Sequence, residues 1–154
     1  MKRIITVLAS MLCLCMVSQA KLALSSVCSD GMVLQQNTEA RIWGTSDAGV
    51  QVTVTPSWNG KAYRCNADSD GRWSVKVETP AGSYKAYSIS VKGDGTVLKI
   101  SDVLVGEVWL ASGQSNMQMP MSGFFNCPVE NAMEYICAPA AREKIRMFNV
   151  PTIH

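Results

Sequence analysis

The sequence predicts a β-sandwich followed by the first βαβ unit of an incomplete α/β domain. Between residues 22 and 101, short runs of alternating apolar and polar residues are separated by turns rich in Gly and Asp. This pattern is typical of a small antiparallel β-sandwich. After Asp102, an apolar run, a polar loop, a helical pattern and another apolar run follow in that order. That order indicates a βαβ unit and therefore a parallel sheet.

The first twenty residues, MKRIITVLASMLCLCMVSQA, read as a secretory signal peptide. Lys2 and Arg3 precede an apolar run over residues 4–17, and small and polar residues then lead to Ala20. The apolar run is shorter than the roughly 20 residues that a membrane-spanning helix needs. We therefore predict cleavage after Ala20, a periplasmic or secreted location, and no membrane segment in the mature protein.

The charge pattern argues against a nucleic-acid partner. The 154 residues carry a net charge of +2, with Lys and Arg spread along the chain, whereas nucleic-acid binding needs clustered basic residues. The hydrophobic share of 47% is ample for a packed core.

Four cysteines lie beyond the predicted cleavage site, namely Cys28, Cys65, Cys127 and Cys137. They form no C-x-x-C pair, which disfavours a zinc site. Two interpretations stay open: buried thiols, which we favour, and one disulfide, which an exported protein can form. Cys28 and Cys65 are the best candidates for such a bridge because both lie in the predicted β region.

The strands of the predicted β-sandwich begin with RIWG at 41–44 and VQVTV at 50–54. In RWSVKV, Trp73, Val75 and Val77 share one face of a strand. DSDG at 68–71 predicts a hairpin turn before this strand, in preference to a calcium loop, which asks for more acidic ligands. Gly93-Asp94-Gly95 predicts a second hairpin.

The predicted βαβ unit begins with a strand at 103–110, which is expected to be buried on both faces. A helix is expected from Pro128, since Pro fits the first helical turn, and Pro139 limits its end. A second strand is predicted at 144–150.

The loop SGQSN at 112–116 follows the first strand of this unit. Open α/β sheets place ligands at the carboxyl ends of their strands. A tight turn there presents a hydroxyl together with backbone N–H groups, which acyl transfer needs as nucleophile and oxyanion donors. Ser115 is the candidate nucleophile, with its own N–H as a donor. Taken alone, the motif is also compatible with a polar turn, because Met117 breaks the G-x-S-x-G pattern.

The segment DVLVGEVWLASGQSNMQMPM resembles the signature of the sialate O-acetylesterases, a family of SGNH-type carbohydrate esterases. The most specific part is GQSNM at 113–117, preceded by VGEVW at 105–109. SDGMVLQQ at 29–36, IWGTSDAG at 42–49 and DSDGRWSVKV at 68–77 are similar to the family's amino-terminal β domain. VENAMEYI and KIRMFNVP are similar to its first helix and second strand.

This resemblance implies an esterase that removes O-acetyl groups from sugars, with Ser115 as the nucleophile and no metal or organic cofactor. Gln114 and Asn116 are implied to position the loop or the substrate. The family's base, a His oriented by an Asp, is contributed near the carboxyl end of its catalytic domain. The single histidine here is His154, the last residue. We therefore expect an amino-terminal, inactive portion of such an enzyme, whose missing carboxyl-terminal part completes the SGNH/flavodoxin-like domain.

The resulting division is a signal peptide at 1–20, a β-sandwich domain at 21–101 and the truncated start of the esterase domain at 102–154. The alternative function is a non-catalytic sugar-binding or interaction module built on the β-sandwich. Trp43, Trp73 and Trp109 are expected in the core, because they lie in predicted strands. Trp58, in the turn-like PSWNGK, is the candidate for an exposed sugar-stacking surface.

Overall fold

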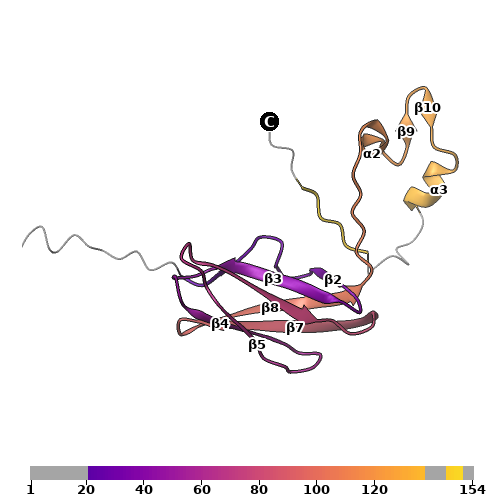
Figure 1. Ribbon diagram of the computed structural model, residues 1–154. Coiled ribbons are helices and arrows are strands. Elements are labelled where there is room, and N and C mark those ends of the chain that lie inside the picture. The colour runs from indigo at the N-terminus through magenta and orange to yellow at the C-terminus, as the bar shows by residue number, and fades with distance from the viewer. Residues whose placement is uncertain (1–20, 138–144, 151–154) are drawn as a thin grey trace, which may run out of the picture.

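The computed structural model describes residues 21–137 and 145–150, and its body is built from β-strands (Figure 1). The strands of this β body are β1 (Ala23–Leu24), β2 (Val33–Gln35), β3 (Glu39–Thr45), β4 (Gln51–Pro56), β5 (Tyr63–Asn66), β6 (Arg72–Glu78), β7 (Ser83–Gly93) and β8 (Thr96–Gly106). The elements that follow are α2 (Ser115–Gln118), β9 (Gly123–Phe124), β10 (Cys127–Pro128) and α3 (Ala132–Cys137). The predicted signal peptide and His154 lie outside the described residues.

The strands of the β body form two sheets. One has three strands in the order β1-β3-β6, and the other has five in the order β2-β8-β7-β4-β5. The β2–β8 pair is parallel, while the other pairs in these two sheets are antiparallel. The prediction of a strand-rich amino-terminal part is therefore confirmed, but the larger sheet is mixed rather than antiparallel throughout.

Both sheets contribute to one hydrophobic core. Ile42 and Val77 come from the three-stranded sheet, and Val54, Ile89 and Val91 come from the five-stranded sheet; none of the five is exposed to solvent. Burial alternates along β3, β4 and β6, as expected when one face of each strand packs inward. Fully burying a side chain of this size stabilises the fold by about 1.5–3 kcal/mol.

The predicted hairpin at Gly93-Asp94-Gly95 is confirmed. β7 and β8 pair antiparallel up to the Gly93–Thr96 pair, so Asp94 and Gly95 form a two-residue turn. Their φ angles are +48° and +67°. Positive φ at both central positions is the requirement of the type I′ turn, whose twist matches that of the flanking strands.

The predicted hairpin around DSDG is wrong, although the turn itself is present. β5 before the turn pairs with β4, and β6 after it pairs with β3, so the turn carries the chain from one sheet to the other. The Asp68 carboxylate accepts hydrogen bonds from the backbone N–H groups of Asp70 and Arg72. An Asx-type turn of this kind looks the same in sequence whether its strands pair with each other or with different partners.

β8 continues without interruption from Thr96 to Gly106, through the predicted boundary between residues 101 and 102. Val103 belongs to the same core as Ile100, and Leu104 and Val105 are also buried. The first half of the predicted strand at 103–110 is therefore the end of β8. The second half is not a strand: residues 107–110 have no regular structure and are exposed. The division into domains stays a prediction.

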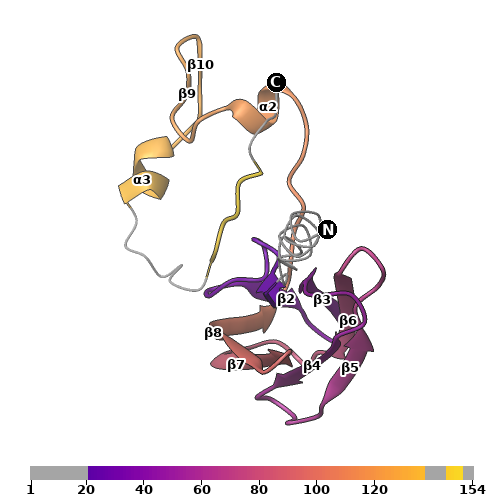
Figure 2. The same cartoon turned by 90° about the vertical axis from the view of Figure 1, so that its left-hand side faces the viewer.

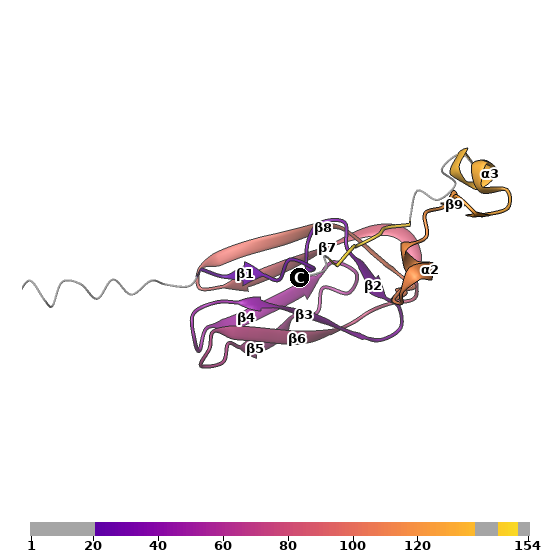
Figure 3. The same cartoon turned by 90° about the horizontal axis from the view of Figure 1, so that it is seen from above.

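The predicted βαβ unit is not confirmed. α3 lies within the predicted helix but is only six residues long, and no strand forms at 145–150, while residue 144 lies outside the described residues. α2, β9, β10 and α3 lie beyond the ends of the two sheets in all three views, so we call residues 107–137 the projecting segment (Figures 1, 2 and 3). Within the described residues, no helix is long and apolar enough to cross a membrane.

Candidate functional site

The candidate site begins where the chain leaves the β body. β2 and β8 are parallel, with Gln35 paired to Gly106 in register, so both strands end at the same edge. The backbone N–H of Gln36 donates to the carbonyl of Gly106 over 2.9 Å and extends this pairing by one residue. The direction in which the projecting segment leaves the sheet is therefore set by the end of β2 as well as by β8.

Two glutamine side chains hold the first residues of the projecting segment. The Gln35 and Gln36 side-chain amides each donate a hydrogen bond to the carboxylate of Glu107. The side-chain oxygen of Gln35 also accepts the backbone N–H of Val108 over 2.8 Å. We call these contacts the Gln–Glu clamp. The pKa of Glu107 lies below its usual value, chiefly because of the Gln36 hydrogen bond and then that of Gln35.

Sequence reasoning missed this clamp. The signal that could have indicated it is Glu107, a carboxylate within an otherwise apolar run, together with two consecutive glutamines at the end of VLQQ. A charged side chain in an apolar run is a signal of nearby polar partners, and the two glutamine amides provide them here.

The candidate nucleophile Ser115 is the first residue of α2, a single turn that ends at Gln118. The Met117 N–H donates to the carbonyl of Gln114 over 2.9 Å, which closes this turn. A Cβ atom at position 113 would lie only 2.9 Å from Met117 Cγ, so glycine allows the loop to pass close to the turn. Because Ser115 opens the helix, its backbone N–H has no acceptor within α2.

Ser115 is exposed, and within the described residues no hydrogen bond reaches its hydroxyl. Gln114 is exposed beside it, whereas the side chain of Asn116 lies outside what the structure describes. The structure therefore places Ser115 on a turn, as the sequence indicated, but not directly at the tip of a buried strand. Residues 107–114, without regular structure, separate it from β8.

The apolar side chains around Ser115 are largely exposed. Trp109 is 87% exposed and Leu110 92%, and Met117, Met121 and Phe125 also face solvent. The expectation that Trp109 lies in the core is therefore wrong for this chain. Isolated apolar residues on a surface are ordinary, whereas three consecutive exposed ones, Val108, Trp109 and Leu110, form a segment able to pack against another surface.

Of the other three tryptophans, Trp73 lies where it was expected, whereas Trp58 and Trp43 do not. Trp73 is buried, as predicted, at 2% exposure. Trp58 is not a free platform: its Nε1–H donates to the carbonyl of Glu78 over 2.8 Å, and its ring packs edge-to-face on Tyr87. Trp43 is not in the core but 37% exposed, because it lies on the outer face of β3.

All four described cysteines are free thiols, so the Cys28–Cys65 disulfide is not formed. Cys28 is buried and Cys65 is half-buried, in line with the favoured interpretation, while Cys127 and Cys137 are exposed. Desolvation raises the pKa of both the Cys28 and Cys65 thiols. Neither thiol is in the thiolate form that nucleophilic chemistry requires at neutral pH.

Comparison with known proteins gives a consistent result. No protein-family model matches the chain. The sialate O-acetylesterase of Mus musculus is 35% identical over 130 residues, covering 79% of this chain and 23% of the mouse protein. That of Homo sapiens is 33% identical over 138 residues, covering 84% of this chain and 25% of the human protein. The chain thus spans about a quarter of the length of these relatives.

A solved structure is similar as well. A carbohydrate acetylesterase from Xanthomonas citri is 38% identical, with a TM-score of 0.58, over 65% of this chain and 22% of that protein. The identity and the TM-score of this match agree with the similarity to the sialate O-acetylesterases.

Proposed function

The chain is homologous to the sialate O-acetylesterases over about four fifths of its length, and from this premise we propose that it is part of a carbohydrate O-acetylesterase. Its relatives are esterases by name, and the similar solved structure is a carbohydrate acetylesterase. The proposed substrate is a sugar that carries an acetyl ester, and the proposed reaction is hydrolysis of that ester to the free hydroxyl and acetate.

We propose Ser115 as the nucleophile. The observation that carries this assignment is the exposed Ser115 on the α2 turn, within the GQSNM motif. Its hydroxyl would attack the carbonyl carbon of the acetyl ester. Its backbone N–H, which has no acceptor within α2, would donate to the oxyanion that develops on the carbonyl oxygen. Gln114 and Asn116 would then contact the substrate or fix the turn.

The base that activates Ser115 comes, in this proposal, from outside these 154 residues. A serine hydroxyl is a weak nucleophile at neutral pH and needs a base within hydrogen-bond reach. The sequence contains one histidine, His154, and we assign it no catalytic role. The segment after Gly106 would be the first part of an SGNH-type α/β domain, and the exposed Trp109 and Leu110 would be buried once that domain is complete. We therefore propose that the 154 residues alone have no esterase activity.

We also propose that the protein is exported. The support is the order of residues 1–20, with Lys2 and Arg3 before an apolar run that leads to Ala20. An extracellular or periplasmic location suits an enzyme that acts on glycans. N-terminal sequencing of the exported protein would test this, and Lys21 is the expected first residue.

The catalytic proposal is tested in a chimera. The chain replaces the matching segment of the Xanthomonas citri carbohydrate acetylesterase, which then supplies the rest of the catalytic domain. We expect the chimera to release acetate from an acetylated sugar. Ser115→Ala should lower kcat on the order of 10³-fold or more, because the acyl acceptor is lost.

Ser112→Ala is the matched control, since Ser112 is exposed in the same loop. It should leave kcat within about twofold of the chimera. Turnover that survives Ser115→Ala would show that Ser115 is only a turn residue. Serine-dependent turnover by the 154 residues alone would contradict the proposal that the base lies elsewhere.

The alternative, a non-catalytic sugar-binding module, is favoured by one observation, a pocket on the β body whose lining includes Trp43, Arg41 and Arg72. If the chimera were inactive while the chain bound sugars, this alternative would be preferred.

A further inference from the structure

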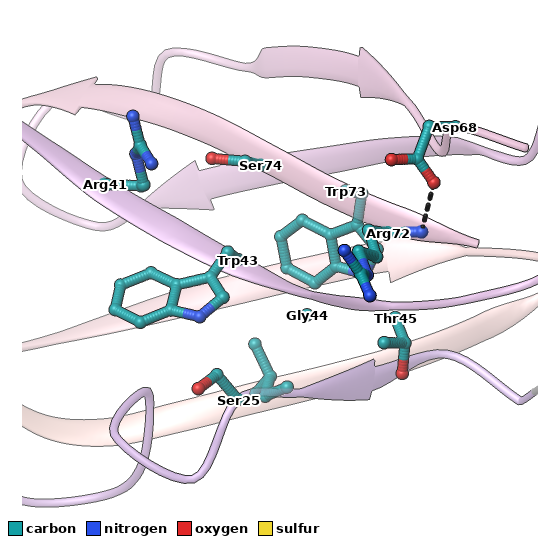
Figure 4. A pocket seen from close by; sticks show the side chains of 10 residues that line it. Ser25, Arg41, Trp43, Gly44, Thr45, Asp68, Arg72, Trp73 and Ser74 are labelled. Atoms are coloured by element: carbon teal, nitrogen blue, oxygen red, sulfur yellow. Dashed lines mark hydrogen bonds between the residues drawn. The ribbon is translucent and has the colours of Figure 1, made fainter. Parts of the chain in front are cut away.

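We propose that the outer face of the three-stranded sheet binds an acidic saccharide at a site separate from Ser115. A pocket of about 620 Å³ opens on this face; among its ten lining residues are Arg41, Trp43, Asp68, Arg72 and Ser74 (Figure 4). These residues come from β3, β6 and the turn before β6, whereas Ser115 lies on the projecting segment (Figure 1).

The register of β3 and β6 places Trp43 at the centre of this face. Trp43 lies directly opposite Ser74, Arg41 opposite Lys76, and Thr45 opposite Arg72. All of these side chains are on the outward, exposed side of their strands. Arg41 and Arg72 therefore flank Trp43 on opposite sides along the strand direction.

The indole of Trp43 is available to a ligand. It is not among the half-buried side chains that pack on the core, in contrast to Trp58. Gly44, the next residue, has no side chain, and a Cβ atom there would lie 2.8 Å from the indole of Trp73. Trp73 thus fills the inner side at this point, and Trp43 presents its ring to the pocket. An exposed aromatic ring beside polar groups is suited to stacking on the apolar face of a sugar.

The charges on this face leave two guanidinium groups for a ligand. The Lys76 ammonium lies 3.3 Å from the Glu39 carboxylate, and Lys61 lies 3.0 Å from that of Glu78. These two pairs use the carboxylates of β3 and β6. Arg41 and Arg72 form no ion pair within the described part of the chain.

Asp68, the one carboxylate among the ten lining residues, gives the two arginines different roles. Asp68 Oδ1 accepts the backbone N–H of Arg72 over 2.7 Å, so this carboxylate lies beside Arg72 in the chain turn (Figure 4). A second anion next to it would be repelled. Arg41, at the opposite side of Trp43, is therefore the residue that binds the ligand carboxylate, with a bidentate geometry that guanidinium groups favour. Asp68 Oδ2, Arg72 and Ser74 then bind sugar hydroxyls.

The test uses the full chain labelled with ¹⁵N. Two acidic probes, the α-methyl glycoside of N-acetylneuraminic acid and tetragalacturonate, are titrated at millimolar concentrations beside two neutral probes, lactose and cellotetraose. We expect the Trp43 indole N–H signal to shift with at least one acidic probe, while the Trp58 and Trp73 signals stay in place. The matching neutral probes should bind at least about tenfold more weakly, because they lack the charge-assisted hydrogen bonds.

Variants separate stacking from charge. Trp43→Ala should abolish binding, and Trp43→Phe should retain it. Arg41→Gln should weaken binding of the acidic probes by about tenfold and leave binding of the neutral probes unchanged. Arg64→Gln, at an exposed arginine on β5, is the matched control and should change neither. Unshifted amide spectra of each variant in regions far from the pocket show that it is folded.

The outcome is separable from that of the catalytic proposal. Ser115→Ala should bind the acidic probes as the unmodified chain does. Absence of any shift with both acidic probes would overturn the site. Equal binding of acidic and neutral probes would overturn its charge selectivity, and shifts confined to residues 112–118 would assign sugar binding to the Ser115 loop instead.

Discussion

Arg146 joins residues 145–150 to the β body through Asp102: its Nη2 lies 2.8 Å from Asp102 Oδ2. Its Nη1 donates to the backbone carbonyls of Asp102 and Met32. Asp102 adopts a φ of +54° within β8, a left-handed conformation that Asp tolerates better than most residues. The guanidinium of Arg146 thus connects its own segment to β8 and to Met32, the residue just before β2, across more than forty residues of sequence.

Replacing Arg146 should release this segment. We expect Arg146→Ala to accelerate chymotrypsin cleavage after Phe148 severalfold, because the segment loses its attachment to the body. The free energy of unfolding of the β body should fall by no more than about 1 kcal/mol, since the Asp102 side chain of this ion pair is 59% exposed. The cleavage rate of Arg146→Lys, which keeps one charged donor group, should lie between the rates of the unmodified chain and of Arg146→Ala. An unchanged cleavage rate would show that other contacts hold the segment.

The shared core predicts that the two sheets unfold together. Ile89 of β7 is completely buried in a cluster that includes Ile42 and Val77 of the other sheet. We expect Ile89→Ala to lower the free energy of unfolding by about 2–5 kcal/mol, through lost burial and the cavity left behind. Val97→Ala, at an exposed position of β8, should change it by no more than about 0.5 kcal/mol. Urea titrations followed by tryptophan fluorescence and by circular dichroism should coincide, and separate transitions would contradict a common core.

Gly71, in the turn that links the sheets, and Gly95, in the β7–β8 turn, should differ in how much stability an alanine substitution costs. Gly71 has a φ of +73°, and a Cβ atom there would lie 2.3 Å from the backbone oxygen of Ser46. Gly95 has a φ of +67°, but a Cβ atom there would meet open space. Gly95→Ala should therefore cost about 1–2 kcal/mol for the left-handed conformation alone. Gly71→Ala should cost clearly more in the same thermal melts, because Ser46 must also move. Equal losses would show that the turn yields without strain.

The sequence predicted the buried faces of the strands well and their pairing less well. Alternation identified Trp73, Val75 and Val77 as inward-facing, because a strand half-buried in a sheet repeats every two residues. The same alternation does not encode the partner of a strand. β5 and β6 therefore read as a hairpin, although they belong to different sheets.

The candidate site was predictable only as a motif. GQSNM indicated a turn that carries Ser115, and the structure has this turn. The apolar run at 103–110 read as a doubly buried strand, whereas its second half, with Trp109 and Leu110, is exposed. Hydrophobicity reports what a segment is able to bury, and burial additionally requires a neighbouring surface. Trp43 was misplaced for a different reason: its position in a strand does not show which face of the sheet it occupies.

The Gln–Glu clamp predicts an acid-dependent loss of stability. Hydrogen bonds from Gln36 and Gln35 hold the pKa of Glu107 below its ordinary value of 4.5. A carboxyl with a lowered pKa in the folded state stabilises the fold above its unfolded pKa. That contribution is lost as the pH falls through the folded pKa. The contribution of Glu107 should therefore be constant near neutral pH and disappear progressively below about pH 4.5.

The comparison that isolates this effect is Glu107→Gln. At pH 7 the variant should be less stable than the unmodified chain, because a neutral amide accepts weaker hydrogen bonds from Gln35 and Gln36. Below the folded pKa of Glu107 the two stability curves should converge, since both side chains are then uncharged. Urea unfolding between pH 3 and pH 7 measures the difference, and an NMR titration of the Glu107 carboxyl in Gln36→Ala should show its pKa shifted upward, because the larger of the two causes is removed. A stability difference that stays the same across this range would mean that the charge of Glu107 does not hold the start of the projecting segment.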